Sequence, residues 1–377
     1  MKISFNRPAM FDKTLESVAK VFENGHASGD GVFTRYCSEW IKSRINVENV
    51  LMTTSGSHAL DMAAYLCNIE PGDEVIMPSY TFPSTANAFL GQGAKIVFID
   101  VRPDTMNMDE ELIEAAITPK TKVVVPVDYA GVPCELDKIN DIAKEHSLLV
   151  VEDAAQALMS TYRGKAVGSQ VDFACFSFHE TKNFSMGEGG AIVINHDELV
   201  EKAEIIREKG TNRSKFFRGQ VDKYSWVDWG SSYLPSELCT AYLWSQLEVA
   251  QNIIDDRLSS WHRYFDGLQD LAQKGRIVLP QIPEHCGHNG HMMFIRVSDL
   301  DERTRLIDYL KQNGIGAPYH YVPLHSSAAG EKYCRFHGED KYTTAESERL
   351  LRLPMFYGLR PVEIDYVIEK VYEFFAD

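Results

Sequence analysis

Two residues of this chain have the side-chain types that chemistry at a pyridine-ring cofactor requires. Lys182 follows the apolar run Phe173-Ala-Cys-Phe-Ser-Phe178, and Asp153 follows the apolar run Leu148-Leu-Val-Val151. A lysine amine can form a Schiff base with the aldehyde of pyridoxal phosphate (PLP), and a carboxylate beside the pyridine nitrogen keeps that nitrogen protonated. Either residue alone would be explained more simply as a solvated loop charge. The pair indicates PLP chemistry.

The two apolar runs must place these side chains at one edge of a sheet. Such runs predict buried parallel strands, and open α/β sheets bind ligands at the carboxyl ends of their strands. Residues 50–195 alternate strand-like with helix-like segments, among them the helices Ser57–Cys67 and Glu135–His146. This alternation predicts an α/β domain with a mostly parallel, seven-stranded sheet. The expected strands are Val50–Thr53, Glu74–Met77, Lys95–Ile99, Lys122–Val127, Leu148–Val151, Phe173–Phe178 and Ala191–Ile194.

The strand expected at Ala191–Ile194 and the C-terminal residues 236–377 remain to be placed. The glycine-rich turn before Ala191 is too short for a crossover helix, so that strand should pair antiparallel. Residues 236–271 are helical in pattern and lack proline, which fits one long helix or two. We expect a large PLP-binding domain over residues 1–247 and a smaller C-terminal α/β domain over 248–377. The elements expected in the smaller domain are a strand at His291–Val297 and helices at Asp301–Asn313, Thr344–Leu351 and Pro361–Phe375.

The bulk composition excludes several classes of protein. The 377 residues are 44% hydrophobic and 24% charged, as in a soluble globular enzyme. A net charge of −16 argues against a nucleic-acid partner, which needs basic surface. No apolar run approaches the ~20 residues of a membrane span, so no membrane partner is expected. The seven cysteines are scattered without a C-x-x-C pair, and no secretory segment precedes them, which predicts a cytoplasmic protein.

The loop Thr53-Thr-Ser-Gly-Ser-His-Ala-Leu60 lies between an expected strand and an expected helix. Small residues such as Gly56 and Ser57 let backbone amides crowd an anion, and a helix N-terminus adds partial positive charge. The loop therefore suits the PLP phosphate, although a plain N-cap serine explains it equally well. A dinucleotide site would need G-x-G-x-x-G at this place. The other glycine-rich run, Gly187-Glu-Gly-Gly190, precedes a strand and does not fit that motif.

Three further segments have competing explanations. Phe82, or Tyr80, at a strand end could stack on the pyridine ring or could simply pack in the core. The basic segment from Arg207 to Tyr224 could bind a diphosphate through its arginines or be a solvated loop. The residues His285, Cys286, His288 and His291 lack the ligand spacing of a zinc site, so no metal is predicted.

Taken together and in order, these segments resemble the DegT/DnrJ/EryC1/StrS family of sugar-nucleotide aminotransferases. The resemblance covers nearly the whole chain. It is carried by Asn6-Arg-Pro8, Gly29-Asp-Gly31, Ser55-Gly-Ser57, Gly72-Asp-Glu-Val-Ile76, Pro78-Ser-Tyr-Thr-Phe82, Glu152-Asp-Ala-Ala-Gln156, Ser177, Lys182 and Gly187-Glu-Gly-Gly190. It implies the aspartate-aminotransferase-like fold, fold type I of PLP enzymes, and a homodimer with shared active sites.

The resemblance also implies roles for individual residues. Lys182 would be the Schiff-base lysine and Asp153 the partner of the pyridine nitrogen, with Gln156 near the ring hydroxyl and Phe82 stacked on the ring. The amides of Gly56 and Ser57 and the hydroxyl of Ser177 would hold the phosphate. Ser232 stands where many members carry an asparagine that reaches the phosphate across the dimer, and Leu234 where many carry an arginine. The residues expected to bind substrate are Arg213, Lys215, Arg218 and His320.

Within the family, Phe176–Asn183, Arg207–Trp226 and Gly230–Leu234 resemble a subgroup that aminates C4 of dTDP-4-dehydro-6-deoxyglucose with glutamate as donor. The implied partners are therefore a nucleotide sugar and glutamate, with pyridoxamine phosphate as the intermediate form of the cofactor. The product could be the galacto or the gluco epimer. A sugar dehydratase on the same fold would carry histidine where Lys182 stands, and a cofactor-binding regulator would usually add a DNA-binding domain.

Overall fold

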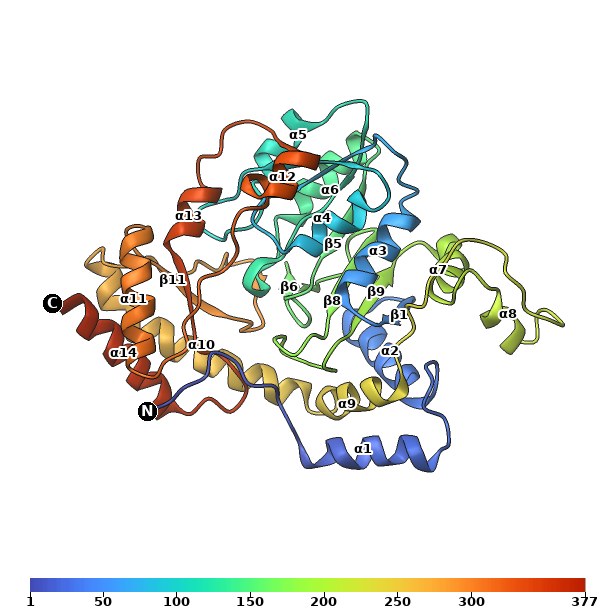
Figure 1. Cartoon of the computed structure of the whole chain (residues 1–377), viewed down its shortest axis with the longest axis horizontal. Helices are drawn as coiled ribbons and strands as arrows, with labels where there is room; N and C mark the ends of the chain where they lie inside the picture. The colour runs from blue at the N-terminus through green and yellow to red at the C-terminus, as the bar shows by residue number, and fades with distance from the viewer. Residues whose placement is uncertain (377) are drawn as a thin grey trace.

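The computed structural model describes residues 1–376, and its centre is an eight-stranded sheet (Figure 1). The strand order is β1-β9-β8-β5-β4-β2-β3-β12. The strands are β1 (Val50–Thr53), β2 (Glu74–Pro78), β3 (Lys95–Ile99), β4 (Thr121–Val124), β5 (Leu149–Asp153), β8 (Phe173–Ser177), β9 (Gly190–Ile194) and β12 (Cys334–Phe336).

The sheet has eight strands rather than the predicted seven, and most of them run parallel, as predicted. Strands β8, β5, β4, β2, β3 and β12 run parallel to one another, whereas β9 pairs antiparallel with both β8 and β1. The extra strand, β12, comes from the C-terminal part and pairs with the edge strand β3, with Cys334 opposite Ile96. A covered edge leaves fewer backbone groups unpaired. Its sequence, Cys-Arg-Phe, is too short and mixed for a periodicity signal.

Alternate side chains of each strand enter two hydrophobic layers, one on each face of the sheet. Ile76 and Val150 pack on the first face, and Val75 and Val151 pack on the second. On the first face lie α2 (Val32–Ile45), α5 (Ile113–Ala116), α6 (Leu136–Glu145) and α9 (Glu237–Leu247); on the second lie α3 (Gly56–Leu66), α4 (Pro83–Leu90) and α7 (Val200–Arg207). Both faces are therefore covered, as parallel sheets require.

The C-terminal part has a separate hydrophobic core around a two-stranded sheet. Strand β11 (Met293–Arg296) pairs antiparallel with β13 (Leu350–Leu353). Helices α10 (Ala250–Gln273), α11 (Leu300–Gln312) and α14 (Pro361–Ala376) bury apolar side chains against this sheet. The predicted helical stretch 236–271 is two helices, since the residue before α10, Val249, leaves the helical conformation. The division at residue 247 stays a prediction.

The remaining elements are short, apart from α1. A three-stranded sheet joins β10 to β6 and β7, so residues expected to form a loop around Cys286 contain a short strand. Within residues 1–376, no helix combines the length and apolarity needed to cross a membrane. The bounds are α1 (Asp12–Glu23), β6 (Thr161–Tyr162), β7 (Lys165–Ala166), α8 (Arg213–Phe217), β10 (Cys286–Gly287), α12 (Ala328–Tyr333) and α13 (Thr343–Arg349).

Candidate active site

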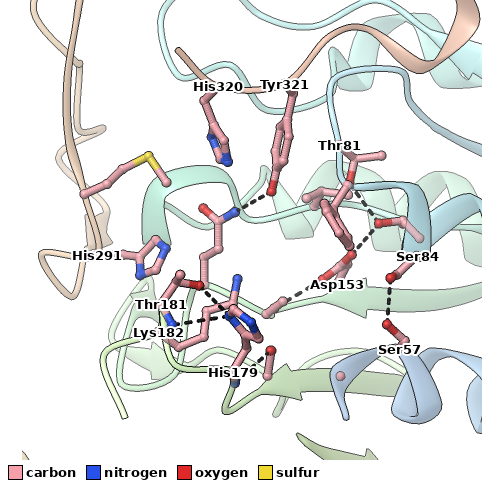
Figure 2. A pocket seen from close by; sticks show the side chains of 18 of the residues that line it. Ser57, Thr81, Ser84, Asp153, His179, Thr181, Lys182, His291, His320 and Tyr321 are labelled. Carbon is pink, nitrogen blue, oxygen red and sulfur yellow. Dashed lines mark hydrogen bonds between the residues drawn. The ribbon is translucent and has the colours of Figure 1, made fainter. Parts of the chain in front are cut away.

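A cavity of about 770 Å³ opens beside the carboxyl ends of β2, β5 and β8. This is the edge at which an α/β sheet binds ligands. Figure 2 shows side chains from several segments converging on it. Eight of the residues predicted from the sequence line this cavity: Gly56, Ser57, Phe82, Asp153, Gln156, Ser177, Lys182 and His320.

Lys182 lies in the turn that follows β8, and its amine faces the cavity. The backbone amide of Lys182 donates to the carbonyl of His179 at 2.9 Å, which fixes the turn. Burial lowers the pKa of the Lys182 amine to about 8. The carboxylate of Asp153 opposes this shift, and the positive charge of Arg352 adds to it. An amine with such a pKa can both take up and release a proton near neutral pH.

Asp153 ends β5 and is buried at the base of the cavity. Its Oδ2 accepts a hydrogen bond from the hydroxyl of Thr85 at 2.6 Å, and its Oδ1 accepts from the amide of Ala155 at 3.2 Å. Burial raises the pKa of Asp153, while these two hydrogen bonds and the Lys182 amine lower it. Thr81 contacts the Thr85 hydroxyl at 2.8 Å (Figure 2). Thr85 was not among the residues predicted from the sequence.

The N-terminus of α3 and the end of β8 form one wall. A Cβ added at Gly56 would lie 2.8 Å from the Cβ of Ser177, so this close approach requires glycine. Ser55 caps α3 by accepting from the amide of His58, and the first amides of a helix have no intrahelical acceptor. The hydroxyl of Ser57 lies 2.6 Å from that of Ser84 (Figure 2). Free amides and hydroxyls at a helix N-terminus fit a phosphate group.

Aromatic side chains form the opposite wall. Phe82 is 57% exposed at the N-terminus of α4, and its ring centroid is 6.3 Å from that of Tyr321. Gln156 connects this wall to the sheet: its Nε2 donates to the Tyr321 hydroxyl at 3.1 Å, and its Oε1 accepts from the amide of Ala130 at 2.7 Å. A flat ring could enter between Phe82 and the end of β5.

His320 is held at the roof of the cavity by two buried tyrosines. The Tyr129 hydroxyl lies 2.9 Å from Nδ1 of His320, and the Tyr80 hydroxyl donates to the His320 carbonyl at 2.7 Å. Tyr80 is therefore a core residue rather than the ring-stacking one. Burial lowers the pKa of His320 well below its usual value, and the charges of Arg352 and Lys182 lower it further. His320 is therefore neutral at physiological pH.

The four predicted residues of the basic segment and its neighbourhood do not line this cavity. Three basic side chains on and just after α8 pair with acids of their own chain, among them Arg213 with Glu208 at 2.8 Å and Arg218 with Glu204 at 2.7 Å. Lys215 pairs likewise with Glu201 at 2.6 Å. Ser232 is exposed and forms a backbone bridge with Glu208. Figure 1 shows that α8 and its flanking loop project from the body.

Two of the histidines considered for a metal have separate protein partners. His285 lies 3.0 Å from the carboxylate of Glu135. His291 lines the cavity, and its Nδ1 lies 2.9 Å from the side-chain oxygen of Asn183. Burial lowers the pKa of His291 well below its usual value.

Sequence reasoning missed several further lining residues, among them the polar or charged side chains of Tyr321, Thr85, Arg352 and His291. Tyr321 follows the predicted His320, and Thr85 lies in the first turn of α4. Arg352 was detectable as a single charge inside the apolar run Leu350–Leu353. His291 was considered only as a metal ligand. Tyr321 and Thr85 carry no periodicity signal, because only the fold brings them to the cavity.

A lysine of lowered pKa that faces a buried carboxylate, beside a helix N-terminus that begins at Gly56, fits PLP. The fold and the cavity therefore define a PLP-dependent enzyme of the aminotransferase type. The DegT/DnrJ/EryC1/StrS aminotransferase family model matches residues 8–372, and the chain belongs to this family. The predicted roles of the individual residues stay predictions.

Two curated relatives match most of the chain. The chain is 32% identical over 376 residues to an uncharacterized protein of Methanocaldococcus jannaschii, covering 97% of this chain and 95% of the relative. It is 34% identical over 323 residues to a protein of Geobacillus stearothermophilus called a pleiotropic regulatory protein, covering 85% and 83%.

A solved structure gives the same result for the fold and the cofactor. The chain is similar to the putative sugar aminotransferase Spr1654 from Streptococcus pneumoniae in its PLP form, with 26% identity and a TM-score of 0.91 over 99% of this chain and 98% of that one. A pyridoxamine-phosphate form of the same protein has an equal TM-score. The protein is a PLP-dependent sugar aminotransferase.

Proposed function

We propose that the enzyme moves the amino group of L-glutamate to C4 of dTDP-4-dehydro-6-deoxy-D-glucose, giving dTDP-4-amino-4,6-dideoxy-D-galactose and 2-oxoglutarate. The Lys182–Asp153 pair in the cavity carries the transamination part of this proposal. The choice of substrate rests on the stretches Phe176–Asn183, Arg207–Trp226 and Gly230–Leu234. These resemble the dTDP-4-amino-4,6-dideoxygalactose transaminase of enterobacterial common antigen synthesis. That resemblance further suggests a role in surface polysaccharide synthesis in the cytoplasm.

In this proposal the cofactor stores the amino group between the two substrates and withdraws electrons from the reacting carbon. Lys182 holds the cofactor in the resting enzyme and moves the proton at the reacting carbon in each half-reaction. Asp153 would stabilise the proton on the ring nitrogen. Gly56, Ser57 and Ser177 would bind the phosphate, and Phe82 and Gln156 would contact the ring and its hydroxyl. Each of these residues lines the same cavity.

We propose that the contacts to the nucleotide part of the substrate come from outside the cavity of the same chain. We place them on α8 and its flanking loop in a partner copy, so the proposed enzyme is a homodimer with shared active sites. Arg213, Lys215 and Arg218 would then contact the diphosphate, Ser232 would approach the cofactor phosphate, and His320 would contact the sugar. Exposed aromatic side chains on that loop, such as Trp226, support an interface there.

The experiment that tests the proposal follows the amino group. Purified enzyme with PLP is mixed with L-glutamate and dTDP-4-dehydro-6-deoxyglucose, and 2-oxoglutarate and the amino sugar are measured. The expected product is the 4-amino sugar, and its NMR ring coupling constants should be those of the galacto epimer. Coupling constants of the gluco epimer would correct the product but keep the enzyme class. No reaction with this sugar, but reaction with another keto-sugar nucleotide, would refute the substrate.

The same assay separates two other functions. A sugar dehydratase would consume the sugar without releasing 2-oxoglutarate. Such an enzyme carries histidine in place of the Schiff-base lysine, so Lys182 argues against it. His179, which is half-buried at the cavity, is the only nearby histidine that the sequence suggested for that role. A regulatory role is suggested by the name of one relative. A regulator would bind the cofactor yet turn over neither substrate.

A further inference from the structure

His291 is a buried residue of the cavity wall that the proposed mechanism does not use. It lies two residues before β11, and Figure 2 shows its ring in the part of the cavity that also contains Lys182. Its backbone is held firmly. Arg257 of α10 donates to the carbonyls of Gly290 and His291, at 3.1 and 2.6 Å, and the His291 amide donates to the side-chain oxygen of Asn289 at 3.0 Å. The ring therefore has a fixed place at the cavity.

The hydrogen bonds around His291 determine which of its ring nitrogens carries the proton. The side-chain nitrogen of Asn183 donates to the carbonyl of Asn289 at 2.9 Å, so the side-chain oxygen of Asn183 is the atom that lies 2.9 Å from Nδ1 of His291. An amide oxygen only accepts, so Nδ1 carries a hydrogen. Burial, followed by the charge of Lys182, lowers the pKa of His291 well below its usual value, so the ring is neutral. Its Nε2 is therefore a hydrogen-bond acceptor.

This acceptor nitrogen faces the cavity without a partner of its own. Within residues 1–376, no group donates a hydrogen bond to Nε2 of His291, and Nε2 is not one of the polar atoms that are buried without a partner. It is therefore open to the cavity that His291 lines. The titratable side chains that act on the ring are Lys182, Arg257, His320 and Arg352, and the charge of Lys182 has the largest effect. The effect of a charge falls with distance, so the Lys182 amine is the donor best placed to reach Nε2.

The Lys182 amine needs such an acceptor whenever it is not bonded to the cofactor. An ammonium has three N–H donors, and a buried one is costly while its hydrogen bonds are unmade. No hydrogen bond joins this amine to the other described residues, 1–376. Asp153 would be occupied by the ring nitrogen of the cofactor, and the hydroxyl of Thr181 already lies 2.9 Å from Nδ1 of His179. Nε2 of His291 is the acceptor that stays free.

We infer that Nε2 of His291 accepts a hydrogen bond from the Lys182 amine and holds that amine in place while the lysine is released from the cofactor. This inference rests on the role proposed for Lys182. A neutral acceptor stabilises the protonated form of the amine. Asn183, the next residue after Lys182, bonds the same histidine ring through Nδ1, so the ring is tied to the turn that carries the lysine. The amine would then occupy the same place before and after each proton transfer.

The test measures the pKa of the Lys182 amine rather than turnover. Enzyme loaded with pyridoxamine phosphate leaves this amine free and needs no sugar nucleotide. Competitive labelling with acetic anhydride over a range of pH, quantified at Lys182 by peptide mass spectrometry, gives the pKa. His291→Asn keeps an N–H donor near the position of Nδ1 but lacks Nε2. The pKa of Lys182 should therefore fall by about one unit, as expected for one lost hydrogen bond to a charged group. An unchanged pKa would overturn the inference.

Two further variants separate this role from a packing role. His291→Gln can place an amide oxygen near the position of Nε2 but loses the Nδ1 bond to Asn183, so its Lys182 pKa should stay closer to the wild type than that of His291→Asn. The opposite order would show that the bond to Asn183 matters instead, and would overturn the inference. His288→Asn is the matched control, because His288 lies on the same segment, accepts from the Gly290 amide at 3.3 Å and does not line the cavity. It should keep the wild-type pKa of Lys182.

The wild type decides the question if His291→Asn fails to fold. In enzyme labelled with ¹⁵N-histidine, the Nε2 resonance of His291, assigned with His291→Gln, should be that of an unprotonated nitrogen. It should shift between the PLP-loaded and the pyridoxamine-loaded forms, because the amine is free only in the second. An identical resonance in both forms would overturn the inference. Equal labelling of Lys182 in the two forms would instead refute the role of Lys182 itself, so the two failures are distinguishable.

Discussion

A single amine carries two tasks in the proposed reaction, and its surroundings explain how. Lys182 must hold the cofactor at rest and must exchange a proton when released. Burial that lowers its pKa to about 8 keeps a useful fraction of the amine neutral near physiological pH. Asp153 limits the shift, so the amine can still be reprotonated. The pKa of the Lys182 amine is thus set by its burial and by the neighbouring Asp153.

The first prediction concerns this amine. Lys182→Ala should bind PLP, because the phosphate wall and Phe82 remain, but borohydride should no longer fix the cofactor to the protein. Turnover should fall by at least the ~10²–10⁴-fold that is typical of a lost general acid–base group. The surface residue Lys202, which lies 3.3 Å from Asn68, provides the control Lys202→Ala. A Lys182→Ala enzyme with near-normal turnover would show that the lysine is structural.

The second prediction concerns Thr85, whose hydroxyl lowers the pKa of Asp153. Thr85→Val removes the hydrogen bond at nearly constant volume, so the carboxylate should protonate at higher pH. A lost hydrogen bond to a charged group is worth about 1.5–3 kcal/mol, which moves the acidic limb of the kcat profile up by about one to two pH units. Thr85→Ser keeps the hydroxyl and should retain the wild-type profile. Identical pH profiles of kcat for the wild type, Thr85→Val and Thr85→Ser would show that Thr85 does not influence Asp153 during turnover.

At the scale of elements, sequence patterns located most strands and helices. The buried strands of the large sheet are uninterrupted apolar runs, so Val50–Thr53 and Lys95–Ile99 were predicted with the bounds that the structure has. Lys182 and Asp153 were detectable because each follows such a run. Strand β12 and Thr85 were not, because their positions depend on contacts between segments far apart in the sequence. Local patterns carry no information on such contacts.

The end of β5 also contains a buried pair of acids beside the site. Asp128 raises the pKa of Glu152. The amide of Gly168 donates to Oε2 of Glu152 and that of Cys134 to Oδ1 of Asp128, whereas Oε1 of Glu152 and Oδ2 of Asp128 are buried without a partner among the described residues. Burial raises the pKa of Asp128 to about 7 and that of Glu152 well above its usual value. Two carboxylates can share this buried place only if one of them keeps a proton.

The third prediction follows from that pair. A carboxyl whose pKa is raised in the folded state binds more protons there than in the unfolded chain. Its contribution to the free energy of unfolding is therefore largest at low pH and is lost as pH rises. The fall should begin near the unfolded Asp value of 3.8 and extend through about pH 7. Glu152→Gln supplies a permanent N–H donor to Asp128, so its stability should fall less. Urea unfolding from pH 5 to 8, at equal PLP saturation, measures this difference, and parallel curves would contradict a shared proton.

At the scale of the whole molecule, the exposed aromatic loop around α8 is hard to explain in an isolated chain. The loop around α8 projects from the body in Figure 1 and exposes several aromatic residues, with Phe217 67% and Trp226 80% accessible. Exposed apolar clusters on a projecting loop mark surfaces that associate with a partner. Three basic side chains of the loop are paired with Glu201, Glu204 and Glu208, and the loop can therefore approach another chain with its charges largely compensated.

The last prediction is that the enzyme is a homodimer through this loop. Light scattering should give about twice the chain mass, and Trp226→Ser should shift the equilibrium toward monomer, because a large apolar side chain leaves the interface. The monomer should lose activity toward the sugar nucleotide, because the loop of the partner would supply the diphosphate contacts. Val362→Ser on α14, at the other end of the molecule in Figure 1 and 54% exposed, should leave both properties unchanged. A fully active wild-type monomer would contradict the shared active site, and the α8 loop would then be an exposed surface with another partner.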